Sequence, residues 1–171
     1  MDKSVAKFTS QNTSPVIQNC ARALTWAADI HVVSTVTAVA WICSRAGSRR
    51  QRQTANRMAA TVAAAAFVPK IIKRAVNRTR PDRIVPGPDR HGVKKSGHPH
   101  DSFPSGHSVH IGAVVSALSE AYPRNALTFW TAGALLAATR AYVLAHWTTD
   151  VIAGLALGVA VERCLRPSKR S

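Results

Sequence analysis

Residues 104–122 read PSGHSVHIGAVVSALSEAY, a Pro-Ser-Gly-His tetrapeptide followed directly by an apolar run. The length and composition of the run predict a helix over residues 108–122. The tetrapeptide would then lie at the N-terminus of that helix, where unpaired backbone N–H groups and the helix dipole favour an anion. The stretch therefore predicts an α-helix with an anion-binding site at its start. A helix cap beside an incidental histidine is the alternative for this stretch taken alone.

Four further apolar stretches accompany this one, at residues 23–43, 58–72, 126–144 and 147–165. The first can span a bilayer, and Trp26 and Trp41 lie near its ends, where interfacial aromatic residues occur. The last contains Gly154-Leu-Ala-Leu-Gly158, a spacing of small residues that lets two helices approach closely. The pattern predicts an all-α fold, an integral membrane bundle of about five transmembrane helices with the active site at one membrane face. A soluble protein with buried core helices is the alternative.

Polar residues divide the chain into three parts. Residues 1–22 form a polar segment suited to a membrane interface, residues 23–165 a single membrane-embedded domain, and residues 166–171 a basic C-terminal tail. Polar side chains interrupt any apolar core in residues 1–25, which therefore do not resemble a signal peptide. We expect the helices themselves to hold the protein in the membrane.

The 171 residues carry a formal net charge of +15, from 23 basic and 8 acidic side chains, although 46% of them are hydrophobic. Such a charge is typical of proteins that bind nucleic acid or an anionic membrane surface. The apolar stretches favour the membrane, and we expect no nucleic-acid partner. Cys20, Cys43 and Cys164 have no metal-ligand spacing, so we expect them to be small packing residues.

A basic motif, Lys73-Arg-Ala-Val-Asn-Arg-Thr-Arg80-Pro81, follows the second apolar stretch. If this segment is helical, Lys73 and Arg80 are separated by nearly two whole turns and point the same way. Pro81 would then stop the helix. The Arg80 guanidinium would lie at the helix end or at the mouth of a loop, where it can fork onto phosphate oxygens. An ordinary basic rim is the alternative for this motif.

Three residues of the tetrapeptide have chemical roles at an anion site. Ser105 supplies a hydroxyl donor, and Gly106 lets the backbone approach the ligand closely. His107, one position further on, is placed to give a proton to a departing oxygen. These residues predict a site that binds phosphate and assists cleavage of its ester bond.

A third motif joins the last two apolar stretches and contains Arg140, His146 and Asp150. His146 and Asp150 are four residues apart at the start of a predicted helix and share one face. The Asp150 carboxylate can accept a hydrogen bond from one ring nitrogen of His146, which leaves the other nitrogen free as a nucleophile. This is the orienting logic of a catalytic triad, with phosphorus as the electrophile. Arg140 adds a further cation.

Other ionisable residues lie outside the three motifs. Asp29 and His31 fall within an apolar stretch, where ionisable groups are costly. We expect them to pair with each other or to lie at the interface, without a catalytic role. Four histidines complete no set of metal ligands and are interpreted as polar loop residues: His91, His98, His100 and His110. We therefore predict no metal site and no cofactor.

In order and internal spacing, the motifs K-x6-R-P, P-S-G-H and R-x5-H-x3-D resemble the signature of the type 2 phosphatidic acid phosphatase superfamily. That superfamily also includes bacterial acid phosphatases and vanadium haloperoxidases. The resemblance covers residues 73–150. It implies that His146 becomes phosphorylated and that His107 then activates the water that hydrolyses the intermediate. It also implies a metal-free phosphate site made by Lys73, Arg80, Ser105, Gly106 and Arg140. Most relatives have a serine before this arginine, where the present chain has Thr139.

The resemblance further implies a membrane lipid phosphatase that acts on a phosphomonoester or a pyrophosphate of a lipid or polyprenyl substrate. The compact chain is similar to bacterial membrane members and too short to resemble the haloperoxidases. Charge does not decide its orientation, but the resemblance favours a bacterial inner membrane and an outward-facing site. The alternatives are a soluble-type acid phosphatase or vanadate-dependent haloperoxidase on the same cradle, and a non-catalytic basic protein that binds anionic membrane lipids. Phosphatidate, phosphatidylglycerol phosphate, polyprenyl phosphates and pyrophosphates, prenyl-linked sugar phosphates and lipid A phosphates all suit the site.

Overall fold

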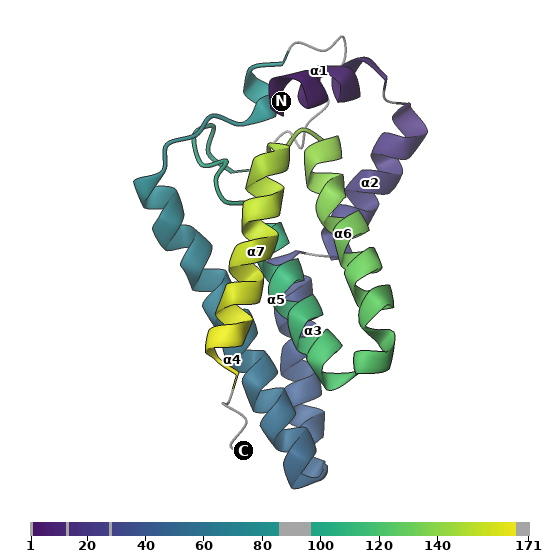
Figure 1. The fold of residues 1–171 in the computed structure, drawn as a ribbon, viewed down its shortest axis with the longest axis vertical. Helices are drawn as coiled ribbons and strands as arrows, with labels where there is room; N and C mark the ends of the chain where they lie inside the picture. Colours follow the sequence, from purple (N-terminus) through teal and green to yellow (C-terminus); the bar gives the residue numbers. More distant parts are fainter. Residues whose placement is uncertain (1, 13, 28, 86–96, 167–171) are drawn as a thin grey trace.

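The computed structural model describes residues 2–12, 14–27, 29–85 and 97–166, and this part of the chain forms a helical bundle (Figure 1). The α-helices are α1 (Asp2–Gln11), α2 (Pro15–Ala27), α3 (Ile30–Cys43), α4 (Arg49–Ala75), α5 (Gly106–Ala121), α6 (Ala126–Tyr142) and α7 (Thr148–Cys164). Three short 3-10 turns connect them: η1 (Ser44–Ala46), η2 (Pro81–Arg83) and η3 (Pro123–Asn125). The predicted all-α class is confirmed for the described residues.

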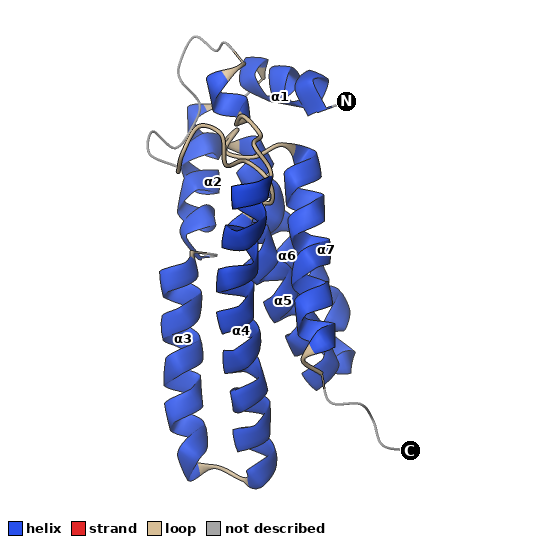
Figure 2. Ribbon diagram, turned by 90° about the vertical axis from the view of Figure 1, so that its left-hand side faces the viewer, coloured by secondary structure: helices blue, strands red, loops and turns tan. Residues whose placement is uncertain are grey.

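Helix α5 is the centre of the bundle and packs against α4, α6 and α7. Helices α3 and α4 run side by side as a long hairpin that extends beyond the other helices (Figure 2). Helix α1 lies across one end of the bundle, next to the start of α7 and the end of α6 (Figure 1). The same end holds the N-terminus of α5, so the elements that carry the three motifs meet there.

Helices α5 and α7 approach each other closely through glycine. A Cβ atom added at Gly158 would overlap the backbone carbonyl of Val109, and one at Gly112 would overlap the carbonyl of Leu155. At Gly154 an added Cβ would lie 2.7 Å from the carbonyl oxygen of Ser105. The close approach predicted from the spacing of Gly154 and Gly158 is therefore confirmed.

The single helix predicted for residues 23–43 is wrong, because the chain breaks between α2 and α3. Asp29 adopts an extended backbone conformation, and its Oδ1 accepts a hydrogen bond of 2.8 Å from the backbone N–H of His31. A carboxylate in this position satisfies a free N–H of the first turn and so starts a new helix. Asp29 and His31 do contact each other, but through this cap and not through paired side chains.

The helix that carries Lys73 does not continue to Pro81, the possibility considered from the sequence, because α4 ends at Ala75. The backbone beyond it is extended and pairs with the segment that precedes α5. The N–H of Arg78 donates to the carbonyl of His100 at 2.9 Å, and that of Arg80 donates to Pro99 at 3.0 Å. These bonds replace the helical ones, so Lys73 and Arg80 reach the same place from different elements.

Large apolar side chains cover much of the outer surface of the bundle. Exposed examples on α3, α4, α6 and α7 are Val36, Val39, Phe67, Ile71, Leu127, Leu135 and Ile152. Taken one at a time, no described helix combines the length and the apolar composition needed to cross a bilayer. Val16–Trp26 with Ile30–Ala46 meets both requirements as a pair, with a bend of 41° at the break. The five spans stay a prediction.

The three cysteines are all exposed and unpaired. Cys20, Cys43 and Cys164 were expected to be small packing residues, but none of them lies in the interior of the bundle. The core positions are taken instead by smaller or branched residues on α4 and α5, including Ala65, Val109 and Ala113. Small residues suit these positions because the helices are so closely spaced.

Candidate active site

The three motifs meet at the end of the bundle where α5 and α7 begin. Arg80 Nη1 lies 3.3 Å from Nε2 of His146, which joins the first motif to the third. The backbone N–H of Ser105 donates to the carbonyl of Asp150 at 3.2 Å, which joins the second motif to the third. The structure thus brings together residues that are up to 77 positions apart in the sequence (150 − 73).

Asp101 holds the two cations of the first motif. Its Oδ1 accepts hydrogen bonds from Arg80 Nη2 at 2.8 Å and from Arg80 Nε at 3.1 Å. Its backbone carbonyl accepts from Lys73 Nζ at 2.9 Å. A carboxylate that bridges a lysine and an arginine places both near one anion site. Sequence reasoning gave Asp101 no part in phosphate binding and missed this role.

Ser105 and Gly106 form the start of α5, as expected. Ser105 is fully buried, and its Oγ accepts hydrogen bonds from the N–H of Ser108 at 3.4 Å and from Ser108 Oγ at 2.9 Å. Its own hydroxyl proton is therefore available to a ligand. A Cβ added to Gly106 would meet no atom within 4 Å. Open space beside the first turn of a helix is what close approach of an anion requires.

A tight turn after α6 presents His146. The carbonyl of Arg140 accepts hydrogen bonds from the N–H groups of Ala145 at 3.1 Å and His146 at 3.2 Å. Within this turn Leu144 has a φ of 56°, in the left-handed region that a side chain with a Cβ rarely adopts. Such a conformation costs on the order of 1–3 kcal/mol and persists only when its surroundings impose it. Buried Leu144 therefore marks a turn that the surrounding structure constrains.

His146 is oriented by Ser102 and not directly by Asp150. The Nδ1 of His146 lies 2.6 Å from the backbone carbonyl oxygen of Ser102, which can only accept, so Nδ1 carries the proton. Nδ1 is 4.0 Å from Asp150 Oδ2, too far for a hydrogen bond. The Ser102 carbonyl therefore takes the place that was expected for Asp150. The expected tautomer, with the proton on Nδ1, is still the one that forms. Nε2 is left unprotonated, and it accepts a hydrogen bond from Arg80 Nη1.

Asp150 instead supports the groups around His146. It is fully buried, and its Oδ2 accepts hydrogen bonds from the Ser102 hydroxyl and, at 2.9 Å, from the backbone N–H of Trp147. Its Oδ1 accepts from the Arg78 guanidinium. Asp150 thereby fixes both the segment that supplies the Ser102 carbonyl and the turn that carries His146. Arg78 was given no role in the site from the sequence, and this contact was missed.

Helix α1 is tied to the same network. Asp2 Oδ2 accepts a hydrogen bond of 2.8 Å from Arg78 Nη2, and it also accepts from the Thr149 hydroxyl. The N-terminal segment therefore contacts the periphery of the site. Its predicted place at a membrane interface stays a prediction.

Burial and nearby cations keep the His146 ring neutral. Burial, and then the positive charges of Arg80, Arg140 and Lys73, hold the pKa of His146 well below its ordinary value. A lowered pKa means that the ring is unprotonated at neutral pH, with Nε2 available as a nucleophile. The same cations are available to neutralise a bound phosphate.

Arg140 and His107 complete the set of predicted residues. Arg140 is 5% exposed, and its Nε has no hydrogen-bond partner within the described part of the chain. The His107 side chain is 24% exposed, and its Nε2 lies 3.9 Å from Oδ2 of Asp29. Asp29 was expected to have no role near the chemistry, and its proximity to His107 is an unexpected feature of the site.

The remaining residues are Thr139 and the histidines outside the three motifs. The Thr139 hydroxyl lies 2.8 Å from that of Thr25 and donates to the carbonyl of Leu136, so it joins α6 to α2. His110 is not a loop residue but lies buried on α5. His98 and His100 do lie exposed in a loop, and His91 lies outside the described residues. Among the residues described, no group of three or more His, Cys, Asp or Glu side chains is arranged to hold a metal ion.

Residues 54–166 match the family model of the PAP2 superfamily. The chain belongs to the PAP2 superfamily. The resemblance inferred from the three motifs is thereby confirmed. Over 99 residues the chain is 39% identical to a lipid A 1-phosphatase of Rhizobium etli and to one of Rhizobium johnstonii. These matches cover 57% of this chain but only 43% and 41% of the two relatives, so the chain spans about two fifths of their length.

Two solved PAP2 structures share the fold. The crystal structure of Aquifex aeolicus LpxE matches with a TM-score of 0.72 and 14% identity, covering 95% of this chain and 92% of the other. The transmembrane PAP2 type phosphatidylglycerolphosphate phosphatase from Bacillus subtilis matches with a TM-score of 0.67 and 18% identity, covering 96% and 82%. At these identities the likeness concerns the arrangement of helices.

Proposed function

We propose that this protein is a membrane phosphatase that removes phosphate from a lipid, without a metal ion, through a phosphohistidine formed on His146. The observation that carries the proposal is the state of that ring. Its Nδ1 is held by the Ser102 carbonyl, and its unprotonated Nε2 accepts a hydrogen bond of 3.3 Å from Arg80 Nη1, a donor that a bound phosphate oxygen would take over. A buried neutral nucleophile among three cations suits attack on an anionic phosphate.

In the first step, the lone pair of His146 Nε2 attacks phosphorus, and the bond between phosphorus and the ester oxygen breaks. His107 gives its proton to the departing oxygen. Lys73, Arg80 and Arg140 neutralise the equatorial oxygens, aided by the Ser105 hydroxyl and by the N–H groups of the first turn of α5.

In the second step, His107 accepts a proton from a water molecule that attacks the phosphohistidine. The phosphorus–nitrogen bond breaks, inorganic phosphate forms, and the electron pair returns to Nε2. The Ser102 carbonyl retains the Nδ1 proton throughout. Asp150 is a positioning residue in this scheme, because it acts through Ser102 and the Trp147 backbone.

The substrate that we propose is a phosphate ester on an amphiphile, with a lipid A 1-phosphate as the first candidate. The support is the 39% identity to two lipid A 1-phosphatases. Polyprenyl phosphates and pyrophosphates, phosphatidate and phosphatidylglycerol phosphate are further substrates to compare. Exposed apolar side chains on several helices support an embedded position. We place the protein in a bacterial inner membrane with the site facing outward.

The test is acid-quench trapping of ³²P on purified protein with a phosphate-labelled lipid. We expect wild type to give a transient label and His146→Ala to give neither label nor turnover. His107→Ala should accumulate label when p-nitrophenyl phosphate is the donor, since this leaving group needs little protonation while water activation is impaired. If His146→Ala still becomes labelled or still turns over substrate, His146 is not the nucleophile.

Metal independence is tested separately. Turnover should persist in EDTA and be inhibited by vanadate, because a trigonal bipyramidal oxyanion suits the cation site. Loss of turnover in EDTA that a divalent ion restores would contradict this part of the proposal.

A further inference from the structure

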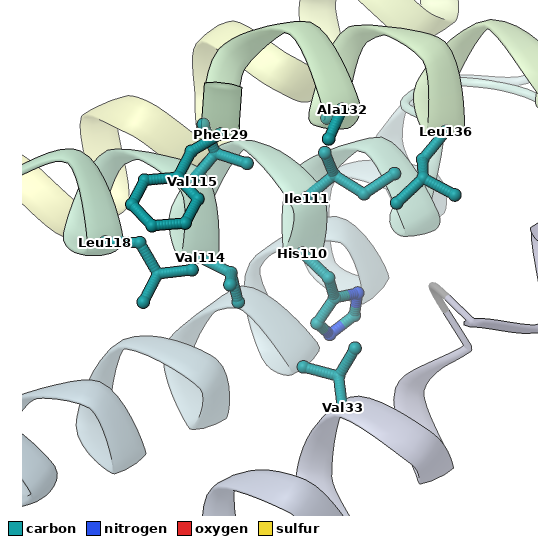
Figure 3. A pocket seen from close by; sticks show the side chains of 10 residues that line it. Val33, His110, Ile111, Val114, Val115, Leu118, Phe129, Ala132 and Leu136 are labelled. Carbon is teal, nitrogen blue, oxygen red and sulfur yellow. The ribbon is translucent and has the colours of Figure 1, made fainter. Parts of the chain in front are cut away.

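An apolar cavity lies between α3, α5 and α6 (Figure 3). It measures about 210 Å³. Its walls are apolar, with a single exception among the ten lining residues. Representative wall residues are Val33, Ile111, Val115, Leu118, Phe129 and Leu136, and the exception is His110.

The His110 ring has an unused acceptor within this cavity. His110 is 5% exposed, and its Nδ1 lies 2.7 Å from the carbonyl oxygen of Gly106. That oxygen can only accept, so Nδ1 carries the proton and Nε2 of the neutral ring has a lone pair. Nε2 has no hydrogen-bond partner within the described part of the chain. Figure 3 shows the ring extending from α5 towards Val33 on α3.

The cavity starts next to the proposed chemistry. His110 lies three residues after His107 on α5, which is about 4.5 Å along the helix axis. The wall continues along the same face of α5 to Leu118, about 12 Å further. A leaving group that departs past His107 therefore meets His110 first and the apolar wall afterwards.

We propose that this cavity binds the first part of one hydrocarbon chain of the lipid substrate, and that His110 Nε2 accepts a hydrogen bond from a hydroxyl or amide N–H group on that chain. The proposal rests on the proposed function. A plain alkyl chain leaves the buried lone pair unpaired, which is costly. An ester carbonyl offers only acceptors and cannot satisfy it. The site thus selects hydroxyacyl or amide-linked chains over ester-linked ones.

The test compares lipid phosphates that share one head group and chain length. One set carries a 3-hydroxyacyl amide, a second a plain acyl amide, and a third a plain acyl ester. We expect wild type to prefer the donor-bearing lipids by about 10- to 100-fold in kcat/KM, mainly through KM. The first two sets distinguish a hydroxyl donor from an amide donor.

Variants at His110 then identify the acceptor. His110→Phe retains a planar ring without an acceptor, so the ratio of kcat/KM for donor-bearing to donor-free lipids should fall to about one. His110→Gln supplies a carbonyl oxygen and should restore part of that ratio. Leu118→Trp, at the far end, should shift the preferred chain length and retain the ratio.

Binding to His146→Ala keeps the two proposals separable. Calorimetric titration of this variant with the same lipids in detergent reports the cavity without turnover. A binding preference for donor-bearing lipids in the absence of wild-type turnover would refute the phosphatase assignment and retain the cavity. No preference in wild type, or an unchanged preference in both His110→Phe and His110→Gln, would overturn the proposal for His110.

Discussion

The Nδ1 atom of His146 donates its hydrogen bond to the backbone carbonyl of Ser102, 2.6 Å away. A backbone carbonyl is uncharged and cannot be protonated, so it fixes the ring as the Nδ1–H tautomer over a wide pH range. Asp150 lies one step further out, where its carboxylate holds the Ser102 hydroxyl and the Trp147 N–H. The sequence predicted a direct contact between Asp150 and His146. In the structure Asp150 binds the Ser102 side chain, and the Ser102 backbone carbonyl binds the imidazole.

The first prediction concerns Asp150→Asn. A carboxylate that bonds the catalytic histidine directly costs about 10⁴-fold in kcat when it is replaced by the amide. Because Asp150 acts through Ser102, we expect a loss of roughly 10- to 100-fold, as for outer partners of a reactive group. The measurement is kcat with p-nitrophenyl phosphate, with His146→Ala as the null control. A loss near 10⁴-fold would mean that Asp150 contacts the ring directly during turnover.

Two glycines on the same pair of helices provide the second prediction. A Cβ at Gly106 meets no atom, whereas one at Gly158 overlaps the carbonyl of Val109. Gly106→Ala should leave the free energy of unfolding within about 1 kcal/mol of wild type. It should still weaken vanadate inhibition by roughly 10- to 100-fold, the value of one hydrogen bond to a charged group.

Gly158→Ala is the matched control. We expect it to lower the stability by about 1–3 kcal/mol through overpacking, with vanadate affinity retained in the folded fraction. Thermal melts and vanadate titrations of both variants in one detergent are the measurements. Equal stability losses in the two variants would contradict the assignment of Gly106 to the ligand side.

Much of the fold follows from local sequence signals. Ser105 caps α5 as its place before an apolar run suggests, and Gly154 and Gly158 mark the contact of α7 with α5. The break at Asp29 and the early end of α4 were not predicted. Both depend on tertiary contacts. A polar residue such as Asp29 in an apolar run can cap a helix, pair with another side chain or face a ligand. The extended residues after Ala75 need a partner segment that is distant in sequence.

Some residues of the candidate site were likewise predicted from the sequence, and others were not. Spacing identified His107, Arg140 and His146, because their roles depend on side-chain chemistry at fixed intervals. Asp101 and the Ser102 carbonyl were missed, because no residue pattern predicts a bridging carboxylate or a backbone acceptor. Asp101 does lie three residues before Pro104, so a carboxylate next to the Pro-Ser-Gly-His motif was the available signal.

The third prediction concerns a buried carboxylate distant from the chemistry. Glu162, near the end of α7, is fully buried and accepts hydrogen bonds from Ser116 Oγ at 2.8 Å and Arg166 Nη2 at 2.6 Å. Removal of Arg166 leaves a buried charge without its cation, whereas removal of the Glu162 charge leaves an arginine whose side chain is 32% exposed and can reach solvent. Arg166→Met should therefore destabilise the protein more than Glu162→Gln.

The expected difference is roughly 1–3 kcal/mol, below that of a fully buried pair because Arg166 is partly solvated. Thermal unfolding in detergent gives the comparison, and kcat should change in neither folded variant. A larger loss in Glu162→Gln would mean that the hydrogen bond from Ser116 matters more than the charge.

The last prediction concerns Asp29, whose Oδ2 lies 3.9 Å from Nε2 of His107. Burial and the positive charge of Arg140 lower the pKa of His107 to about 3, and the negative charge of Asp29 opposes that shift. Asp29 therefore favours the protonated imidazole, the form that can give a proton to the leaving oxygen. The same side chain caps α3, so an alanine would confound the two effects. Asparagine caps helices equally well and has no charge. Asp29→Asn therefore isolates the electrostatic contribution.

We expect Asp29→Asn to keep the melting temperature of wild type and to lose about 10-fold in kcat with a phosphate that has an alkyl leaving group, a fraction of the roughly 10²–10⁴-fold available from acid catalysis. With p-nitrophenyl phosphate the loss should be small, because p-nitrophenolate departs without a proton. Asp29→Ala should show the same dependence on leaving group and also a lower melting temperature. Equal losses on both substrates would show that Asp29 acts through the structure of the α2–α3 break and not through His107.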